Sequence, residues 1–261
     1  MEPGTPPWPS YTILKARVDA PTWAQALERI AAWAEAGESR YVCVANVHVV
    51  MEAYDRPDFR QVVNGADLVV PDGMPLVWML RRMGRRGQPR LYGAELVLRL
   101  CEVAEQRGIP VGVYGSHPQT LARLLERLRR DYPRLRVVYA HSPPFRPLTP
   151  EEDAQDVEEM RQKGVRILFV SLGCPKQERW MADHRGRVPA VMLGVGAAVD
   201  FLTGTKPQAP RWMQQAGLEW LFRLLTEPRR LWRRYLKHNP RFLLLALFHL
   251  YRWRRKTHGR A

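Results

Sequence analysis

The stretch RILFVSLGCPKQERWMADH, residues 166–184, contains the unit from which the fold of this chain is predicted. Its first part, RILFVSLG, is an apolar run of the length expected for a buried strand at 166–173. A glycine turn follows, and residues 175–184 have the pattern of a helix. An apolar strand that leads straight into a helix is typical of a parallel sheet covered on both faces.

The same unit recurs along the chain. Further strands are predicted at 41–45, 66–73, 111–115, 135–140 and 190–197. Helices are predicted at 22–36, 47–54, 59–64, 93–107, 118–131 and 151–163, with another apolar helix after Gly73. Apolar strands between helices of period 3.6 predict an α/β fold with a Rossmann-like, mostly parallel, doubly wound sheet. Ligands of such sheets bind at the carboxyl ends of the strands.

The charge divides the chain into two parts. Residues 211–261 hold thirteen lysines and arginines against two carboxylates, a net charge of +11, and the other 210 residues carry only +4. The composition changes at KPQAPRW, 206–212. We therefore predict a catalytic core at 1–208 and a basic, amphipathic C-terminal appendage at 209–261. Such asymmetry indicates a polyanionic partner: nucleic acid, an anionic membrane or a phosphorylated substrate.

The appendage mixes aromatic, leucine and arginine residues, as in GLEWLFRLLTEPRRLWRRYLKHNP at 217–240. Helices are predicted at 212–225 and 228–238, and a last segment is expected after Pro240. The longest uncharged apolar run, 242–251, has ten residues, whereas a helix that crosses a bilayer needs about 20. Composition supports equally an interfacial membrane helix pair and a pair docked on the core with a solvated basic face.

Several classes of site are missing from the sequence. Three scattered cysteines without a CxxC pair indicate a reducing compartment, and the absence of HExxH and HxxxH predicts no zinc site. The N-terminus does not resemble a secretory signal. P-loop, GxSxG and DxD motifs are absent. A bound nucleotide diphosphate would therefore have to be neutralised by backbone amides and cations, without a protein-held metal.

Polar residues follow several predicted strands. Asn46 comes after the strand at 41–45, and Asp72 comes after VVP, where a catalytic carboxylate or an ordinary helix cap would both fit. SLGCPKQERW, 171–180, and GVYGS, 112–116, place glycine turns before helices, which suits a diphosphate. GVGAAVDF, 194–201, has Val199 where a dinucleotide fingerprint needs a small residue, so a nucleotide-dependent reductase is disfavoured.

Seven collinear segments together resemble the WecG/TagA/CpsF family of bacterial glycosyltransferases. They are ANVH (45–48), ADLVVPDGMPLVW (66–78), RLYGAEL (90–96), GIPVGVYGSHPQTL (108–121), SLGCPKQERW (171–180), GVGAAVDFLTG (194–204) and APRWMQQAGLEWLFRLLTEPRRLWRRYLKHNP (209–240). The resemblance implies an inverting, metal-independent enzyme that moves a sugar from a UDP-sugar to a polyprenyl-diphosphate-linked saccharide. It also implies no cofactor beyond that co-substrate, and a peripheral, monotopic place on the cytoplasmic face of the membrane.

The resemblance also implies roles for individual residues. The catalytic base falls on Asp72, and the residues expected to assist it are Asn46, Arg90 and Gln177. The UDP moiety is expected at Gly115, Ser116, Gly173, Lys176, Gln177, Glu178, Gly196 and Asp200. The arginines assigned to the lipid diphosphate fall on Arg223, Arg230 and Arg233, and no residue is expected to bind a metal.

This sequence departs from the family pattern at Val44, where some members have Thr, and at Glu95, where GxDL has Asp. The spelling is closer to exopolysaccharide enzymes of the xanthan type, so the donor stays open among UDP-N-acetylmannosamine, UDP-glucose and UDP-glucuronic acid. A basic nucleic-acid-binding protein is the alternative. It lacks support from any RNP, zinc-finger or helix-turn-helix signature, and nucleic acid is not an expected partner. The sequence leaves a homo-oligomer open.

Overall fold

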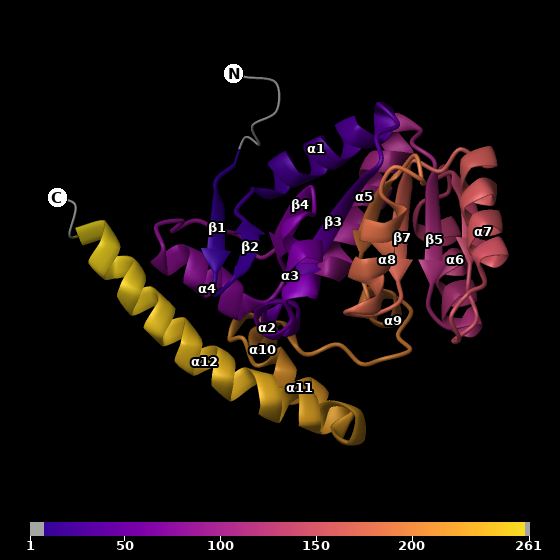
Figure 1. Ribbon diagram of the computed structural model, residues 1–261. Helices are drawn as coiled ribbons and strands as arrows, with labels where there is room; N and C mark the ends of the chain where they lie inside the picture. Colours follow the sequence, from indigo (N-terminus) through magenta and orange to yellow (C-terminus); the bar gives the residue numbers. More distant parts are fainter. Residues whose placement is uncertain (1–7, 259–261) are drawn as a thin grey trace.

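A computed structural model describes residues 8–258 (Figure 1). Its centre is a six-stranded sheet in the order β4-β3-β8-β7-β5-β6, and every neighbouring pair is parallel. The strands are β3 (Arg40–Ala45), β4 (Leu68–Pro71), β5 (Val111–Gly115), β6 (Val137–His141), β7 (Ile167–Ser171) and β8 (Val191–Gly194). The predicted parallel sheet is therefore confirmed.

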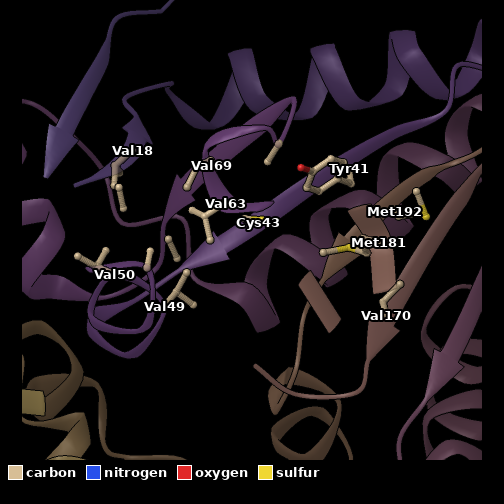
Figure 2. Packing of buried hydrophobic residues seen from close by; sticks show 14 of the residues in the cluster. Val18, Tyr41, Cys43, Val49, Val50, Val63, Val69, Val170, Met181 and Met192 are labelled. Atoms are coloured by element: carbon tan, nitrogen blue, oxygen red, sulfur yellow. The ribbon is translucent and has the colours of Figure 1, made fainter. Parts of the chain in front are cut away.

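Helices cover both faces of the sheet. On one face lie α1 (Trp23–Glu35), α5 (Gly93–Arg107), α6 (Pro118–Asp131) and α9 (Ala198–Leu202). On the other lie α2 (Val47–Asp55), α3 (Pro57–Asn64), α4 (Met74–Arg82), α7 (Pro150–Gln162) and α8 (Lys176–His184). Successive strand residues point to opposite faces, so Val42 and Val44 pack under the first group of helices whereas Tyr41 and Cys43 pack under the second (Figure 2).

A small hairpin of β1 (Ser10–Ile13) and β2 (Ala16–Asp19) forms a separate antiparallel sheet that the sequence pattern did not predict. Asp19 ties it to the main sheet, because its buried carboxylate accepts a hydrogen bond from the backbone N–H of Val69 at 2.8 Å. The hairpin thus extends the body beyond β4 and gives the C-terminal helix a surface to rest on.

The predicted helix at 212–225 is wrong, because two short helices occupy this region. They are α10 (Arg211–Gln215) and α11 (Glu219–Thr226), which Gly217 separates with a φ of 68°. A Cβ at this glycine would collide with the Trp78 ring on α4. The break therefore lets the chain turn in close contact with the body, in a backbone conformation that favours glycine.

The prediction that a helix ends at residue 238, with a separate segment after Pro240, is also wrong. A single helix, α12 (Pro228–His258), continues through Pro240. Leu231 is buried before the proline, and Phe242 and Ala246 are buried after it. Burial on both sides of Pro240 offsets the hydrogen bond that a proline removes, which explains why the helix is not interrupted.

Figure 1 shows α12 lying across the end of the molecule toward which the strands of the main sheet point, with α11 beside its N-terminal part. Arg241 forms a two-pronged ion pair with Asp55 on α2 at 2.8 and 2.9 Å, and the Trp253 ring lies 6.0 Å from that of Tyr11 on β1. The boundary predicted at residue 208 lies in the connection from α9 to α10, and its status as a domain boundary stays a prediction. Within residues 8–258, none of the helices is long and apolar enough to cross a bilayer.

Candidate active site

A cavity of about 1370 Å³ opens at the carboxyl ends of β3, β4, β5, β7 and β8, where α11 and α12 border it. The structure brings together at this cavity nearly all the residues that the sequence predicted for the site. They are Asn46, Asp72, Arg90, Gly115, Ser116, Gly173, Lys176, Gln177, Glu178, Gly196, Asp200, Arg223 and Arg230. Arg233 is not among the lining residues.

Asp72 lies directly after β4, and its side chain is 16% exposed. It does not cap the helix that follows it, because Gly73 is the N-cap of α4 and no side chain caps that helix. Its Oδ1 instead accepts a hydrogen bond from the backbone N–H of Gly93, the first residue of α5, at 3.1 Å. The interpretation of Asp72 as the cap of α4 is therefore wrong. Its carboxylate, directly after β4, instead binds the backbone at the start of α5.

Burial raises the pKa of the Asp72 carboxyl above its ordinary value. The Arg90 guanidinium lowers that pKa, Glu219 raises it, and the Gly93 N–H lowers it. A partly desolvated carboxylate is a stronger base than a solvated one, which is the property that a proton acceptor at neutral pH needs. The electrostatic setting of Asp72 thus fits the role predicted for it.

Arg90 connects Asp72 to the appendage. Its Nη2 lies 3.7 Å from Asp72 Oδ1 and 2.7 Å from Glu219 Oε2, and its Nε donates to the Asp72 carbonyl. The guanidinium also lies over the Tyr92 ring, 4.3 Å from its centroid. Glu219, which the sequence analysis did not place in the site, therefore holds the start of α11 against the candidate base.

Asn46 fixes the start of α2 beside Asp72. Its Oδ1 accepts hydrogen bonds from the backbone N–H groups of His48 at 3.0 Å and Val49 at 3.4 Å, as an N-cap residue does. A Cβ at Gly73 would lie 3.3 Å from the Cα of Asn46, so the two loops pass very close to each other. Asn46 is thus at once a structural cap and a lining residue of the cavity.

The loop after β5 packs tightly on the end of β7. Gly115 has a φ of 108°, and a Cβ there would lie 2.5 Å from the Ser171 carbonyl oxygen. Ser116, with a φ of 66°, donates its backbone N–H to that same oxygen at 2.8 Å. This backbone N–H is therefore already paired, and the loop offers the cavity its shape and the Ser116 side chain.

Gln177 and Glu178 form a buried pair behind the loop that follows β7. Gln177 Oε1 accepts from the backbone N–H of Gly173 at 3.1 Å, and its Nε2 donates to Glu178 Oε1 at 2.9 Å. Glu178 is fully buried, and burial raises its pKa. Glu178 thus fixes the Gln177 side chain, which in turn binds the backbone of the turn at Gly173.

Asp200 and the three predicted arginines differ in how they meet the cavity. Asp200 forms an ion pair with Lys206, a lining residue that no sequence motif indicated. Arg223 lies over the Phe201 ring at 5.3 Å, and Arg230 pairs with Glu227. The exposed Arg233 lies over Trp232, one position away from the cavity-lining Arg234.

Arg223 and Arg234 each bury their Nε without a hydrogen-bond partner. A one-residue shift along a helix turns a side chain by about 100°. That rotation explains why sequence register alone did not separate Arg233 from Arg234. The structure thus adds Lys206, Glu219 and Arg234 to the residues that sequence reasoning placed at the site.

Comparison with known proteins gives a family match and a related enzyme. A protein-family model described as the glycosyl transferase WecG/TagA/CpsF family matches residues 11–257. The chain is also similar to the N-acetylglucosaminyldiphosphoundecaprenol N-acetyl-β-D-mannosaminyltransferase of Bacillus spizizenii. The two are 31% identical over 211 residues, which cover 80% of this chain and 79% of the relative.

Arg90 pairs with both Asp72 and Glu219. Two substitutions should therefore shift the pKa of the Asp72 carboxyl in opposite directions. Glu219→Gln should lower it, because a like charge is removed and Arg90 is released toward Asp72, whereas Arg90→Gln should raise it. Carboxyl-carbon NMR titration of Asp72 measures both shifts. Glu227→Gln, which removes the other appendage carboxylate, is the control and should leave the pKa unchanged. Shifts of the same sign for Glu219→Gln and Arg90→Gln would contradict this electrostatic account.

Proposed function

Since the chain belongs to the WecG/TagA/CpsF family of glycosyl transferases, we propose that it transfers a sugar from a UDP-sugar to a polyprenyl-diphosphate-linked saccharide. The transfer inverts the anomeric centre and uses no metal. The observation that carries the proposal is the desolvated Asp72 carboxylate at the carboxyl end of β4, inside a cavity bordered by cationic helices. One positioned base and one bound diphosphate leaving group are sufficient for a single displacement.

In the proposed reaction Asp72 takes the proton of an acceptor hydroxyl as the hydroxyl oxygen attacks the anomeric carbon. The new glycosidic bond forms as the bond from the anomeric carbon to the UDP oxygen breaks, so the configuration inverts. Arg90 keeps Asp72 ionised before the transfer, because it lowers the pKa that burial raises. Asn46, beside Asp72, helps to orient the sugar.

The donor diphosphate is proposed to lie along the loops after β5 and β7. The turns at Gly115, Gly173 and Gly196 keep side chains out of this part of the cavity. Lys176 and Lys206 place two cations on its lining, and charge-assisted hydrogen bonds from such groups can stabilise the departing UDP. Asp200 is the proposed partner of the uridine, in place of its present pairing with Lys206.

The acceptor is proposed to enter between α11 and α12. The relative from Bacillus spizizenii is named for an undecaprenol-linked diphosphate substrate. On this chain, Arg223, Arg230 and Arg234 bring three cations from the appendage to the same cavity as Asp72. Arginine suits a diphosphate because its planar group offers several donors. The appendage therefore supplies part of the active site as well as contact with the lipid.

Membrane binding is proposed for the outer face of α12 at the cytoplasmic side of the membrane. Its exposed large apolar residues outside the cavity are Trp232, Leu236, Leu244, Phe248 and Tyr251, whereas the exposed Leu243 and Leu247 also line the cavity. Exposed Arg252, Arg254, Arg255 and Lys256 follow near the end of the helix. An apolar helix face next to a cluster of cations is suited to lie in the interface of an anionic membrane.

Replacement of Asp72 by Asn should lower turnover by about 10²–10⁴-fold, the contribution of a positioned base. UDP-sugar affinity should change little, because the substitution keeps the shape of the side chain. Release of UDP from UDP-N-acetylmannosamine, UDP-glucose and UDP-glucuronic acid, with a lipid-diphosphate sugar acceptor, measures turnover and identifies the donor. Full turnover by Asp72→Asn would refute the assignment of the base. Absence of UDP release from the unaltered enzyme with every donor would count against the UDP-sugar class.

The two adjacent arginines of α12 should respond differently to substitution. Arg234→Gln should raise KM for the lipid-diphosphate acceptor by about 10- to 100-fold, the loss of a charge-assisted hydrogen bond of about 1.5–3 kcal/mol. Arg233→Gln is the matched control, and we expect a change of no more than about threefold because this side chain lies outside the cavity. Steady-state kinetics with varied acceptor make the comparison. The reverse order of effects would show that Arg233 is the residue that meets the diphosphate.

The membrane contact predicts weaker vesicle binding when the outer face of α12 loses apolar groups. The double variant Leu244→Ser and Phe248→Ser should bind anionic vesicles at least about tenfold less, since each side chain contributes roughly 1.5–3 kcal/mol when buried. Cosedimentation with phosphatidylglycerol vesicles measures this. Phe145→Ser removes an exposed phenylalanine from the body and serves as the control. Equal binding by all three proteins would place the contact elsewhere.

A further inference from the structure

Three metal-ligating side chains meet where α12 crosses α2. His48 and Glu52 lie one helical turn apart on α2, and His238 comes from α12. One potential ligand atom from each residue lies within 4.8 Å of those of the other two. In the stretch 8–258 this is the one group of its kind. The sequence analysis predicted no zinc site because HExxH and HxxxH spacings are absent. Spacing along the chain does not reveal this cluster, because its third residue, His238, comes from a distant helix.

The cluster contains polar atoms that lack partners. The Nδ1 atoms of His48 and His238 are both buried without a hydrogen bond, although His238 Nε2 lies 3.4 Å from Glu52 Oε1. His238 and Glu52 are 3% and 8% exposed, so water does not solvate them freely. A buried polar atom without a partner costs about 1–3 kcal/mol. Packing alone does not explain two buried imidazole nitrogens without partners in one cluster.

We propose that His48, Glu52 and His238 bind one Zn²⁺ ion that fastens α12 to α2. Two imidazoles and a carboxylate form a common zinc ligand set, with bonds of about 2.0–2.2 Å. Ligand atoms around a tetrahedral zinc are then roughly 3.4 Å apart, so the present separations close with small side-chain adjustments. His48 and His238 also line the cavity.

Charged side chains of both signs surround the cluster, and the two carboxylates among them are Glu52 and Asp55. Arg234 and Lys237 place positive charge near His48, but Asp55 pairs with Arg241 and lies 3.9 Å from Lys237. Glu52 carries one negative charge to the site, and its contact with Arg56 is long, at 3.5 Å. Zinc would replace this long contact with a direct bond to the carboxylate.

The site goes beyond the proposed sugar transfer, since it concerns how the appendage is held. Arg234, four residues before His238, lines the cavity from the same helix. A bond from His238 to a metal on α2 would fix the rotation of α12 about its axis and its position along that axis. It would thereby also fix the position of Arg234 in the cavity. The ion thus stabilises one arrangement of the appendage on the body and takes no part in the chemical step.

The test uses the tag-free full-length chain, stripped with a chelator and dialysed against buffered Zn²⁺. We expect one tightly bound zinc per chain and slower tryptic cleavage of α12 when zinc is present. His48→Gln and His238→Gln should each weaken zinc binding by more than about 100-fold, beyond the 10–100-fold effect of outer-sphere changes. They should also abolish the protection from trypsin. His117→Gln, a change at an exposed histidine that is not part of the cluster, is the matched control.

Circular dichroism and the melting temperature of the metal-free proteins establish that the variants fold. Zinc that is absent from the unaltered chain, or that stays bound equally in His48→Gln and His238→Gln, would overturn the proposal. If one variant does not fold, the other carries the comparison. Zinc binding and trypsin protection are measured without any sugar substrate, so failure of UDP release would bear on the proposed function alone.

Discussion

The candidate site depends on the partial burial of one carboxylate, Asp72, at the edge where the parallel strands end. Its desolvation is tolerable because the Gly93 N–H and the Arg90 guanidinium face it. Arg90 in turn is shared with Glu219 from α11, so the electrostatic balance of the candidate base extends into the appendage. This shared ion pair explains why the core and the C-terminal helices have to be considered as one site.

Helix α12 meets three surroundings at once. Leu231, Phe242 and Ala246 bury one side against the body, Arg234 and His238 face the cavity, and a third side carries exposed apolar residues. The helix is 31 residues long, and it meets Glu52 on α2 through His238 and Tyr11 on the first hairpin through Trp253. Under the proposed function, this one helix connects the proposed membrane contact with the cavity that Asp72 lines. This arrangement is consistent with the proposed transfer to a lipid-linked acceptor by a member of this glycosyl transferase family.

Much of the fold was predictable because its signals are local. The strands and most core helices follow from apolar runs and 3.6-residue periods, and the family resemblance is confirmed by the match over residues 11–257. The hairpin of β1 and β2 was missed, since its four-residue strands carry too little pattern. The sequence predicted one continuous helix where Gly217 breaks the chain, and it predicted a helix end where α12 continues through Pro240. Both predictions are wrong. In both cases packing against the body, on Trp78 and around Phe242, decided against local propensity.

The sequence by itself determined which residue types stand at the strand ends, and parallel connectivity then required Asn46, Asp72, Ser116 and Gln177 to gather at one edge. Tertiary structure alone decided which neighbours these residues meet. The pairing of Arg90 with Glu219, the choice of Arg234 over Arg233 as a lining residue, and the meeting of His48 with His238 join segments far apart in the chain. Such contacts depend on the exact angle and rotation at which α11 and α12 pack. Periodicity cannot supply these, because it describes each helix without its partner.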